Sequence, residues 1–180
     1  MPKRVTFLAR SIAVALVAVA ISTVAGAGAA NAATTGPWVV QGYNSDDCVV
    51  VHNDSKANDA QVELGLCGWD ESQWDFINAP SGPYYRIRHR DSGKCMAVKD
   101  SSTANSAKVV QTTCFRGYNE LWLPVKKASA RGVDYYELKN YNSGLCLNVK
   151  GNATGEGADL VQYACDAKAH NDWFTWNPQT

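Results

Sequence analysis

The sequence lacks an excess of charge of either sign, because 17 Lys and Arg balance 17 Asp and Glu over 180 residues. Residues 1–33 hold Lys3, Arg4 and Arg10 and no acid, so 14 basic residues stand against all 17 acidic ones in the rest of the chain. A domain with that acidic surplus lacks the basic patch on which nucleic-acid binders depend. We therefore expect no nucleic-acid partner.

The sequence also lacks the short motifs of common enzymes and metal sites. It has no G-x-S-x-G, no H-E-x-x-H and no glycine-rich phosphate loop. It has no C-x-x-C pair, which argues against structural zinc. The three histidines, His52, His89 and His170, belong to no nucleophile motif. The sequence therefore predicts a protein that is not an enzyme and that holds no cofactor and no metal.

Long hydrophobic runs are absent after the first thirty residues. The start is positive, an apolar run spans residues 12–21, and Ala30-Asn31-Ala32 forms an A-x-A site. This arrangement is typical of a secretory signal peptide, whereas a membrane anchor needs about 18 or more apolar residues. We predict a signal peptide over residues 1–32 with cleavage after Ala32. The mature chain, residues 33–180, is then secreted and contains no membrane span.

Six cysteines are present, all after the predicted cleavage site, and disulfides are the default for an even number in an oxidising compartment. Their spacing repeats: Cys48 to Cys67, Cys95 to Cys114 and Cys146 to Cys165 are each 19 residues apart. A tryptophan follows each pair at seven or eight residues, namely Trp74, Trp122 and Trp173. Three repeats of about fifty residues are indicated, and the repeat selects pairing within each unit.

The segments around the cysteines repeat as well. A turn sequence precedes the first cysteine of each unit, as in Asp91-Ser92-Gly93, and an alternating apolar strand follows it, as in Met96-Ala97-Val98. In such a strand the first and third residues are expected to point inward and the middle one outward. Four short strands per unit give about twelve strands. Units this small share one core, and closure removes sheet edges. We predict an all-β, closed, pseudo-threefold barrel.

With these elements in place, the chain resembles the ricin B-chain type of β-trefoil lectin over nearly all of residues 38–176. The resemblance implies one lectin domain over residues 33–180, with repeats at about 38–80, 84–127 and 135–178. The family's Gln-x-Trp signature keeps its tryptophan three times and loses its glutamine, as in Glu120-Leu121-Trp122. The resemblance implies binding of galactose-like sugars or xylan-type polysaccharides.

The family's sugar pocket uses an acid two residues past the first cysteine and an aromatic residue two before the second. Polar residues two or three before the tryptophan complete it. In the first unit these places hold Val50 and Gly65, and in the second Ala97 and Thr112, so neither pocket is expected to bind.

The third unit keeps polar and aromatic residues at the family's pocket positions. The resemblance implies carbohydrate binding by Asn148, Tyr163, His170 and Asn171. A pyranose packs its apolar face on an aromatic ring, and its hydroxyls need polar partners. Asn148 stands where the family has an acid, and we expect this exchange to cost affinity on the order of 1 kcal/mol.

Other interpretations of these residues stay open. The three tryptophans are expected in the core, His170 fits a surface loop, and Trp69, Phe115 and Tyr118 form an alternative stacking surface. Glycans or polysaccharides are the expected partners. The alternative function is a β-trefoil scaffold with degenerate sugar pockets that acts by protein–protein interaction or inhibition.

Overall fold

The computed structural model describes residues 33–178, except residues 69, 116, 131, 167 and 169, so the predicted signal peptide lies outside the described residues. Within the described part, no helix has the length and apolar character that crossing a membrane requires. The all-β prediction is confirmed, with the following elements: β1 (Thr34–Gly42), β2 (Cys48–Val51), η1 (His52–Asp54), β3 (Val62–Gly65), β4 (Gln73–Asn78), β5 (Tyr85–His89), β6 (Cys95–Val98), η2 (Lys99–Ser101), β7 (Val109–Thr112), η3 (Tyr118–Glu120), β8 (Leu121–Ala130), β9 (Val133–Asn140), β10 (Cys146–Val149), η4 (Lys150–Asn152), β11 (Leu160–Tyr163) and β12 (Phe174–Pro178).

Six of these strands close into a barrel. β1 pairs with β4, β4 with β5, β5 with β8, β8 with β9, β9 with β12, and β12 with β1, and every pair is antiparallel. Each repeat thus supplies two barrel strands. A closed ring of strands leaves no free sheet edge within the barrel. The predicted closure of the barrel is thus confirmed.

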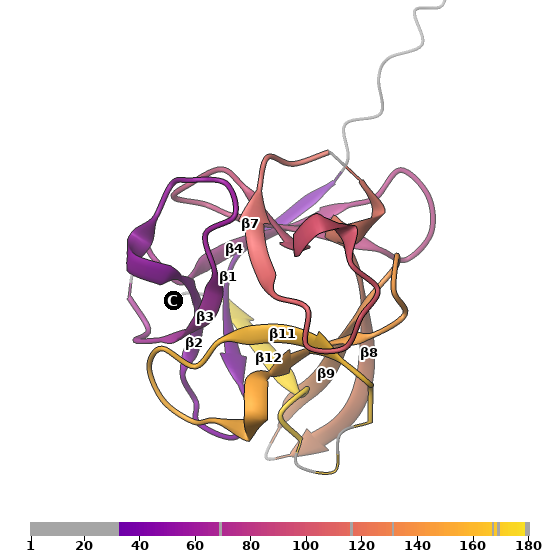
Figure 1. Ribbon diagram of the computed structural model, residues 1–180. Coiled ribbons are helices and arrows are strands. Elements are labelled where there is room, and N and C mark those ends of the chain that lie inside the picture. The colour runs from indigo at the N-terminus through magenta and orange to yellow at the C-terminus, as the bar shows by residue number, and fades with distance from the viewer. Residues whose placement is uncertain are drawn as a thin grey trace, which may run out of the picture. The chain divides into compact units, whose positions relative to one another are not determined.

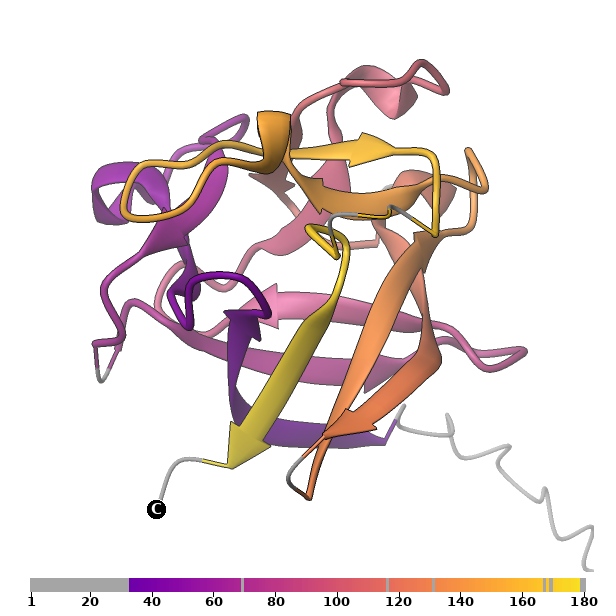
Figure 2. The same cartoon turned by 90° about the horizontal axis from the view of Figure 1, so that it is seen from below.

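The other six strands form three hairpins, β2–β3, β6–β7 and β10–β11. Figure 2 shows the hairpins above the barrel strands, and Figure 1 shows β3, β7 and β11 arranged around one centre. Single β-bridges join neighbouring hairpins, pairing Gln61 with Val110, Glu63 with Asp159 and Lys108 with Val161. The hairpins therefore form a threefold cap on one end of the barrel.

Two buried glutamines lock neighbouring repeats together. Gln111 of β7 donates from Nε2 to the carbonyl oxygens of Ser55 and Ala57 in the first repeat, at 2.6 and 2.9 Å. Gln162 of β11 makes the same pair of bonds to the second repeat, at 2.9 and 2.8 Å. In the first repeat this position is Leu64, which is buried in the core instead. Two of the three junctions between repeats therefore carry this glutamine contact.

A small second cluster holds Val39, Cys48 and Val50, while the main core cluster joins the hairpins to the barrel. As predicted, the first and third residues after each leading cysteine belong to it: Val49, Val51, Met96, Val98, Leu147 and Val149. The middle residues, Val50, Ala97 and Asn148, lie outside this cluster but are not exposed, with 8%, 0% and 4% of their surface accessible. The expectation that they point outward was thus only half right, because neighbouring segments cover the outer face of each hairpin strand.

The third tryptophan does not occupy the core place that its spacing predicts. Trp74 and Trp122 are fully buried, and their indole N–H groups donate to the carbonyl oxygens of Val49 and Met96, at 2.8 and 3.0 Å. In the third repeat the fully buried ring is Phe174, while Trp173 is only half-buried. The core ring follows the second cysteine by seven, eight and nine residues in the three repeats, at Trp74, Trp122 and Phe174. Because a phenylalanine occupies the core place in the third repeat, counting to the tryptophan gave the wrong position.

Each repeat contains one disulfide, as predicted. The bridges are Cys48–Cys67, Cys95–Cys114 and Cys146–Cys165, with Cα–Cα distances of 5.1, 5.0 and 5.0 Å. Each bridge ties the first residue of a hairpin to the segment that follows the second hairpin strand. The bridges therefore hold the bases of the three hairpins closed.

The predicted turns before the leading cysteines are present, but a different side chain stabilises them. Their last residues, Asp46, Gly93 and Gly144, have positive φ of 58°, 68° and 70°. In turns that begin with Asx, the Asx side chain commonly accepts the stabilising hydrogen bond. In the structure the serine hydroxyl accepts the N–H two residues later in all three turns, at 3.2–3.3 Å, from Asp47, Lys94 and Leu145.

Candidate functional site

A pocket of about 390 Å³ lies over the outer face of the third-repeat hairpin. It brings together three of the four residues predicted to bind sugar, Asn148, Tyr163 and Asn171. The remaining lining comes from η4 and from neighbouring segments: Ser106, Lys150, Gly151, Asn152 and Val161. Among the described residues, Ser106 is the one that the second repeat contributes to this pocket.

Asn148 forms the floor of this pocket. It lies in β10, opposite Val161 of β11, and only 4% of its surface is accessible. Its Oδ1 accepts a hydrogen bond from Nδ2 of Asn171 at 2.8 Å, so its own Nδ2 is the free end of the amide. That Nδ2 is buried and has no hydrogen-bond partner. A buried donor without an acceptor costs about 1–3 kcal/mol, which a ligand oxygen would recover.

Asn171 fixes the orientation of this amide. Its Nδ2 group donates to Oδ1 of Asn148 and also to the carbonyl oxygen of Val149, both at 2.8 Å. Both protons of the Asn171 amide are thereby used inside the protein. Asn171 therefore holds Asn148 in place and leaves the Asn148 amide nitrogen available to the pocket.

Tyr163 supplies an aromatic wall. It is the last residue of β11, it pairs with Cys146, and 44% of its surface is accessible. Tyr163 lies opposite Cys146 and two residues before Cys165, and the disulfide between these cysteines restrains the end of the strand that carries the ring. An exposed ring beside a polar floor gives the pocket one apolar face and one hydrogen-bonding face.

Two charged or polar side chains form the rim of the pocket. Lys150 Nζ lies 3.5 Å from Oδ2 of Asp159, across the hairpin. Asn152 accepts a hydrogen bond at Oδ1 from Asn44 Nδ2 of the first repeat, at 3.0 Å. Between them, Gly151 has φ of 63°, in the left-handed region that favours glycine. The rim is therefore held by contacts to residues outside the pocket.

The fourth predicted residue, His170, does not line the pocket. Its ring lies against Trp173, with ring centroids 4.0 Å apart, and beside Tyr43 at 5.7 Å. The cause is the one-residue shift of the core ring. The family's polar position lies three residues before the core ring. Counted from Phe174 that position is Asn171, whereas counting from Trp173 had given His170.

The second repeat supports this corrected register. Asn119 stands three residues before Trp122, and its Nδ2 donates to the carbonyl oxygen of Val98 at 2.7 Å. Asn171 makes the same bond to the equivalent carbonyl of Val149. Both repeats thus share the sequence pattern Asn-x-x-aromatic, with Asn119 before Trp122 and Asn171 before Phe174. This pattern would have identified Phe174 as the core ring of the third repeat, and sequence reasoning missed it. Val161 was also recoverable, because placing Tyr163 opposite Cys146 puts Val161 opposite Asn148.

The equivalent position in the first repeat has no room for an aromatic wall. A Cβ atom added to Gly65 would lie 2.6 Å from Cγ2 of Val50. The pocket there, about 280 Å³, is lined instead by acidic side chains and by Leu66, which is 71% exposed. The four acids are Asp54, Glu63, Glu71 and Glu156.

Two buried acids of the third repeat, Glu137 and Asp172, do not line the pocket. Burial raises the pKa of Glu137, and the adjacent carboxyl of Asp172 raises it further. The backbone N–H of Asp166, 2.6 Å from Oε1, and the Lys127 ammonium, 3.4 Å from Oε2, act in the opposite direction. Glu137 also approaches Cys146 and Cys165, but both sulfurs are in a disulfide and offer no thiolate to a metal.

Of the alternative stacking surface, Phe115 and Tyr118 fall within the described part of the chain. Trp69 lies outside the described residues. Phe115 and Tyr118 are both 65% exposed, but Phe115 packs under the guanidinium of Arg86 at 4.7 Å, and Tyr118 lies beside Tyr141 at 5.1 Å. The two rings therefore have separate neighbours.

Comparison with known proteins gives a consistent family match. A family profile described as ricin-type beta-trefoil lectin domain-like matches residues 23–112, 70–163 and 118–180. A comparison with curated proteins gave no match. Among solved structures, the designed threefold-symmetric protein ThreeFoil is 28% identical, with a TM-score of 0.73, over 81% of this chain and all of that one.

Two further structures extend the comparison. An exo-beta-1,3-galactanase from Clostridium thermocellum is 25% identical, with a TM-score of 0.72, over 81% of this chain but only 30% of its own. The Rhizoctonia solani agglutinin is 15% identical, with a TM-score of 0.67, over 82% of this chain and 96% of its own. The agglutinin match concerns the fold alone.

Proposed function

The chain belongs to the ricin-type β-trefoil lectin-like family, and from this premise we propose that it binds galactose-like or xylan-type glycans, mainly through the third repeat. The observation that carries the proposal is the unpartnered, buried Nδ2 of Asn148 in a pocket whose wall is the exposed ring of Tyr163. A lectin needs both kinds of surface at one site.

The pocket's chemistry suits one pyranose ring. The apolar face of the sugar packs on Tyr163, as sugar rings do on aromatic side chains. A hydroxyl oxygen accepts the free N–H of Asn148, whose direction is fixed by Asn171. The same hydroxyl can donate its proton to a rim group or to water, so its hydrogen bonds are replaced on binding. No bond is broken in this scheme, and we assign no catalytic step.

The affinity of a single pocket of this kind is expected to be low, roughly millimolar. A neutral hydrogen bond contributes about 0.5–1.5 kcal/mol, against about 1.5–3 for a bond to a charged group. Lectins with several pockets gain avidity from simultaneous contacts, and two of the three pockets here have lost the pattern. We therefore propose a weak, monovalent binder.

We also propose that the protein acts outside the cell. Three disulfides suit an oxidising compartment, and residues 1–32 read as a secretory signal peptide. Residues 33–180 then form the mature lectin domain. Mass spectrometry of the exported protein tests this directly, since the expected N-terminus is Ala33.

A glycan array tests the binding proposal. The protein should give a signal that free sugar competes away, and Tyr163→Ala should lose that signal while keeping its fold. If neither galactose-type nor xylan-type glycans give a competable signal, the proposal fails. That outcome would favour the alternative, a β-trefoil scaffold with degenerate pockets that binds another protein.

A further inference from the structure

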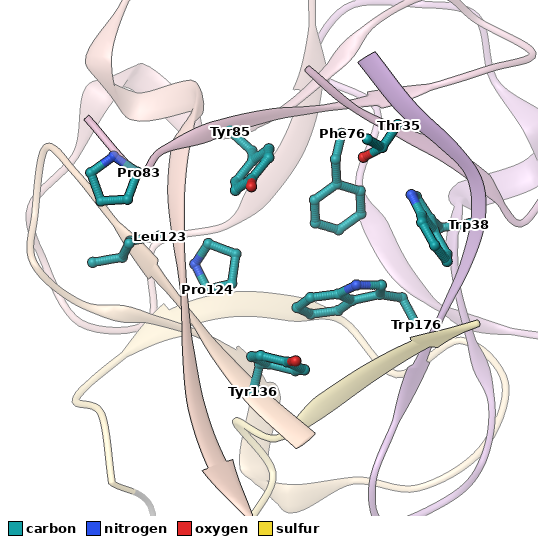
Figure 3. Close-up of a pocket in the computed structure, with 9 residues that line it drawn as sticks. All are labelled: Thr35, Trp38, Phe76, Pro83, Tyr85, Leu123, Pro124, Tyr136 and Trp176. Carbon is teal, nitrogen blue, oxygen red and sulfur yellow. The ribbon is translucent and has the colours of Figure 1, made fainter. Parts of the chain in front are cut away.

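A second cavity, of about 320 Å³, opens at the barrel end away from the hairpin cap, where β1 begins and β12 ends. Figure 3 shows its rings, which come from barrel strands of all three repeats. Its walls are chiefly Trp38, Phe76, Tyr85, Pro124, Tyr136 and Trp176. None of these residues belongs to the third-repeat pocket, so this cavity is a separate feature.

The cavity arises from a break in the threefold pattern. Trp38, Tyr85 and Tyr136 pair with the core rings Trp74, Trp122 and Phe174 on neighbouring strands. Two residues after those core rings come Phe76, Pro124 and Trp176. The first and third repeats thus supply two aromatic rings each, whereas the second supplies Tyr85 and a proline. The small proline ring leaves the space that a phenylalanine or tryptophan would fill.

The walls are flat and aromatic. Tyr136 and Trp176 are stacked, with ring centroids 4.4 Å apart and planes inclined by 27°. Phe76 lies 5.1 Å from Trp176 and 5.8 Å from Tyr85, measured between ring centroids. Such walls favour a planar aromatic guest, since offset and edge-to-face ring pairs contribute about 0.5–1.5 kcal/mol beyond their buried area.

The polar side-chain groups of the cavity carry no charge: they are the indole N–H groups of Trp38 and Trp176 and the hydroxyls of Thr35, Tyr85 and Tyr136. Among the described residues, neither the indole N–H of Trp38 and Trp176 nor the hydroxyl of Tyr85 donates to a protein acceptor. None of the lining residues in the described part of the chain is charged, and none of them has a carboxylate or amide side chain. A sugar would lose too many hydroxyl hydrogen bonds here, and an ion would lack a counter-charge.

We propose that this barrel-end cavity binds an uncharged aromatic compound of one or two fused rings that carries an oxygen acceptor. The ring system occupies the space left by Pro124 and packs on Trp176. Its oxygen accepts a hydrogen bond from an indole N–H or from Tyr85. The volume lies at the small end of the range for ligand pockets, which limits the guest to about this size.

2-Naphthol is the probe, because it is flat, bicyclic, uncharged at neutral pH and carries one oxygen. Titration followed by tryptophan fluorescence and by calorimetry should show saturable binding to the full chain. Naphthalene-2-sulfonate, which adds a charge, should bind more weakly. Galactose should not compete, and Tyr163→Ala should bind 2-naphthol as the wild type does, which separates this site from the lectin pocket.

Pro124→Phe is the decisive variant, because it completes the third aromatic pair and fills the cavity. We expect it to stay folded and to bind 2-naphthol at least about tenfold more weakly, a change of one decade in Kd. If it does not fold, Thr35→Trp closes the same cavity from an exposed strand position. Absence of saturable binding by the wild type, or unchanged affinity in a folded, filled variant, overturns the proposal.

Discussion

The first-repeat and third-repeat hairpins have the same strand pairing and differ in the side chains on their outer faces. Both begin at a bridged cysteine, and the residue two places on pairs with the equivalent partner, Val50 with Glu63 and Asn148 with Val161. The third hairpin displays an amide floor and a tyrosine wall, whereas Val50 and Gly65 stand at those places in the first. A trefoil repeat therefore keeps its fold while its outer face changes.

The reason lies in which residues the core uses. The core takes the first and third residues of each leading strand, so these stay apolar in every repeat. The middle residue and the end of the second strand lie outside the main core cluster, and they range from valine to asparagine and from glycine to tyrosine. The proposed sugar site is therefore built from positions that the main core cluster does not use.

The largest expected effect tests the corrected register of the third repeat. Phe174→Ala should lower the free energy of unfolding by about 3–5 kcal/mol, because it empties a fully buried aromatic site. Trp173→Ala should cost clearly less, since that ring is half-buried beside Tyr43 and His170. Urea unfolding followed by circular dichroism compares the two, and the reverse order would restore Trp173 to the core.

Removing the bridges one at a time should separate stability from binding. Replacing both cysteines of any one bridge by alanine should cost about 2–5 kcal/mol of stability. Only loss of Cys146–Cys165 should also weaken sugar binding, because that bridge closes the base of the hairpin that carries Tyr163. Loss of Cys48–Cys67 is the control. Equal losses of affinity in both folded variants would contradict a single third-repeat site.

A buried histidine makes the stability pH-dependent. Burial lowers the pKa of His89, whose Nε2 contacts the carbonyl oxygen of Glu71 at 3.0 Å. The folded state therefore keeps the ring neutral, while the unfolded chain takes up a proton as the pH falls through about 6.5. This contribution to stability is present above that pH and is lost as the pH drops toward the lowered folded pKa.

His89→Asn should remove this part of the acid sensitivity. The third repeat already has asparagine at the matching place, where Asn140 donates to the carbonyl oxygen of Asn119 at 2.9 Å. Unfolding free energies measured near pH 7 and near pH 5 should differ less in the variant than in the wild type. An unchanged difference would assign the acid sensitivity to other groups.

The smallest expected effect is the gain of a second sugar-binding site. Ala97→Asn with Thr112→Tyr copies the third-repeat floor and wall into the second repeat, where Asn119 already donates to Val98 as Asn171 does to Val149. The double variant should bind a second sugar with similar, weak affinity, seen as a higher stoichiometry in calorimetry. If the folded variant shows the wild-type stoichiometry, the floor, wall and locking asparagine are not sufficient for a site.

Sequence reasoning recovered what repeats three times and failed where one copy departs. The cysteine spacing and apolar alternation predicted the bridges and the barrel, because those features serve the core in every unit. His170 lies outside the lining of the pocket because the core ring of the third repeat is Phe174 and not Trp173, which shifts the count by one residue. The contributions of Ser106 and Asn44 to the pocket and its rim had no local signal, since they arrive from other repeats through the closed fold.

The most direct test of a third-repeat lectin site is titration calorimetry of Tyr163→Ala and Thr112→Ala with the glycan that the array selects. The two residues hold the same place in their hairpins, opposite Cys146 and Cys95. Tyr163→Ala should abolish measurable binding, because it removes the apolar wall, and Thr112→Ala should bind as the wild type does. Equal affinity in the wild type and in Tyr163→Ala would contradict the account.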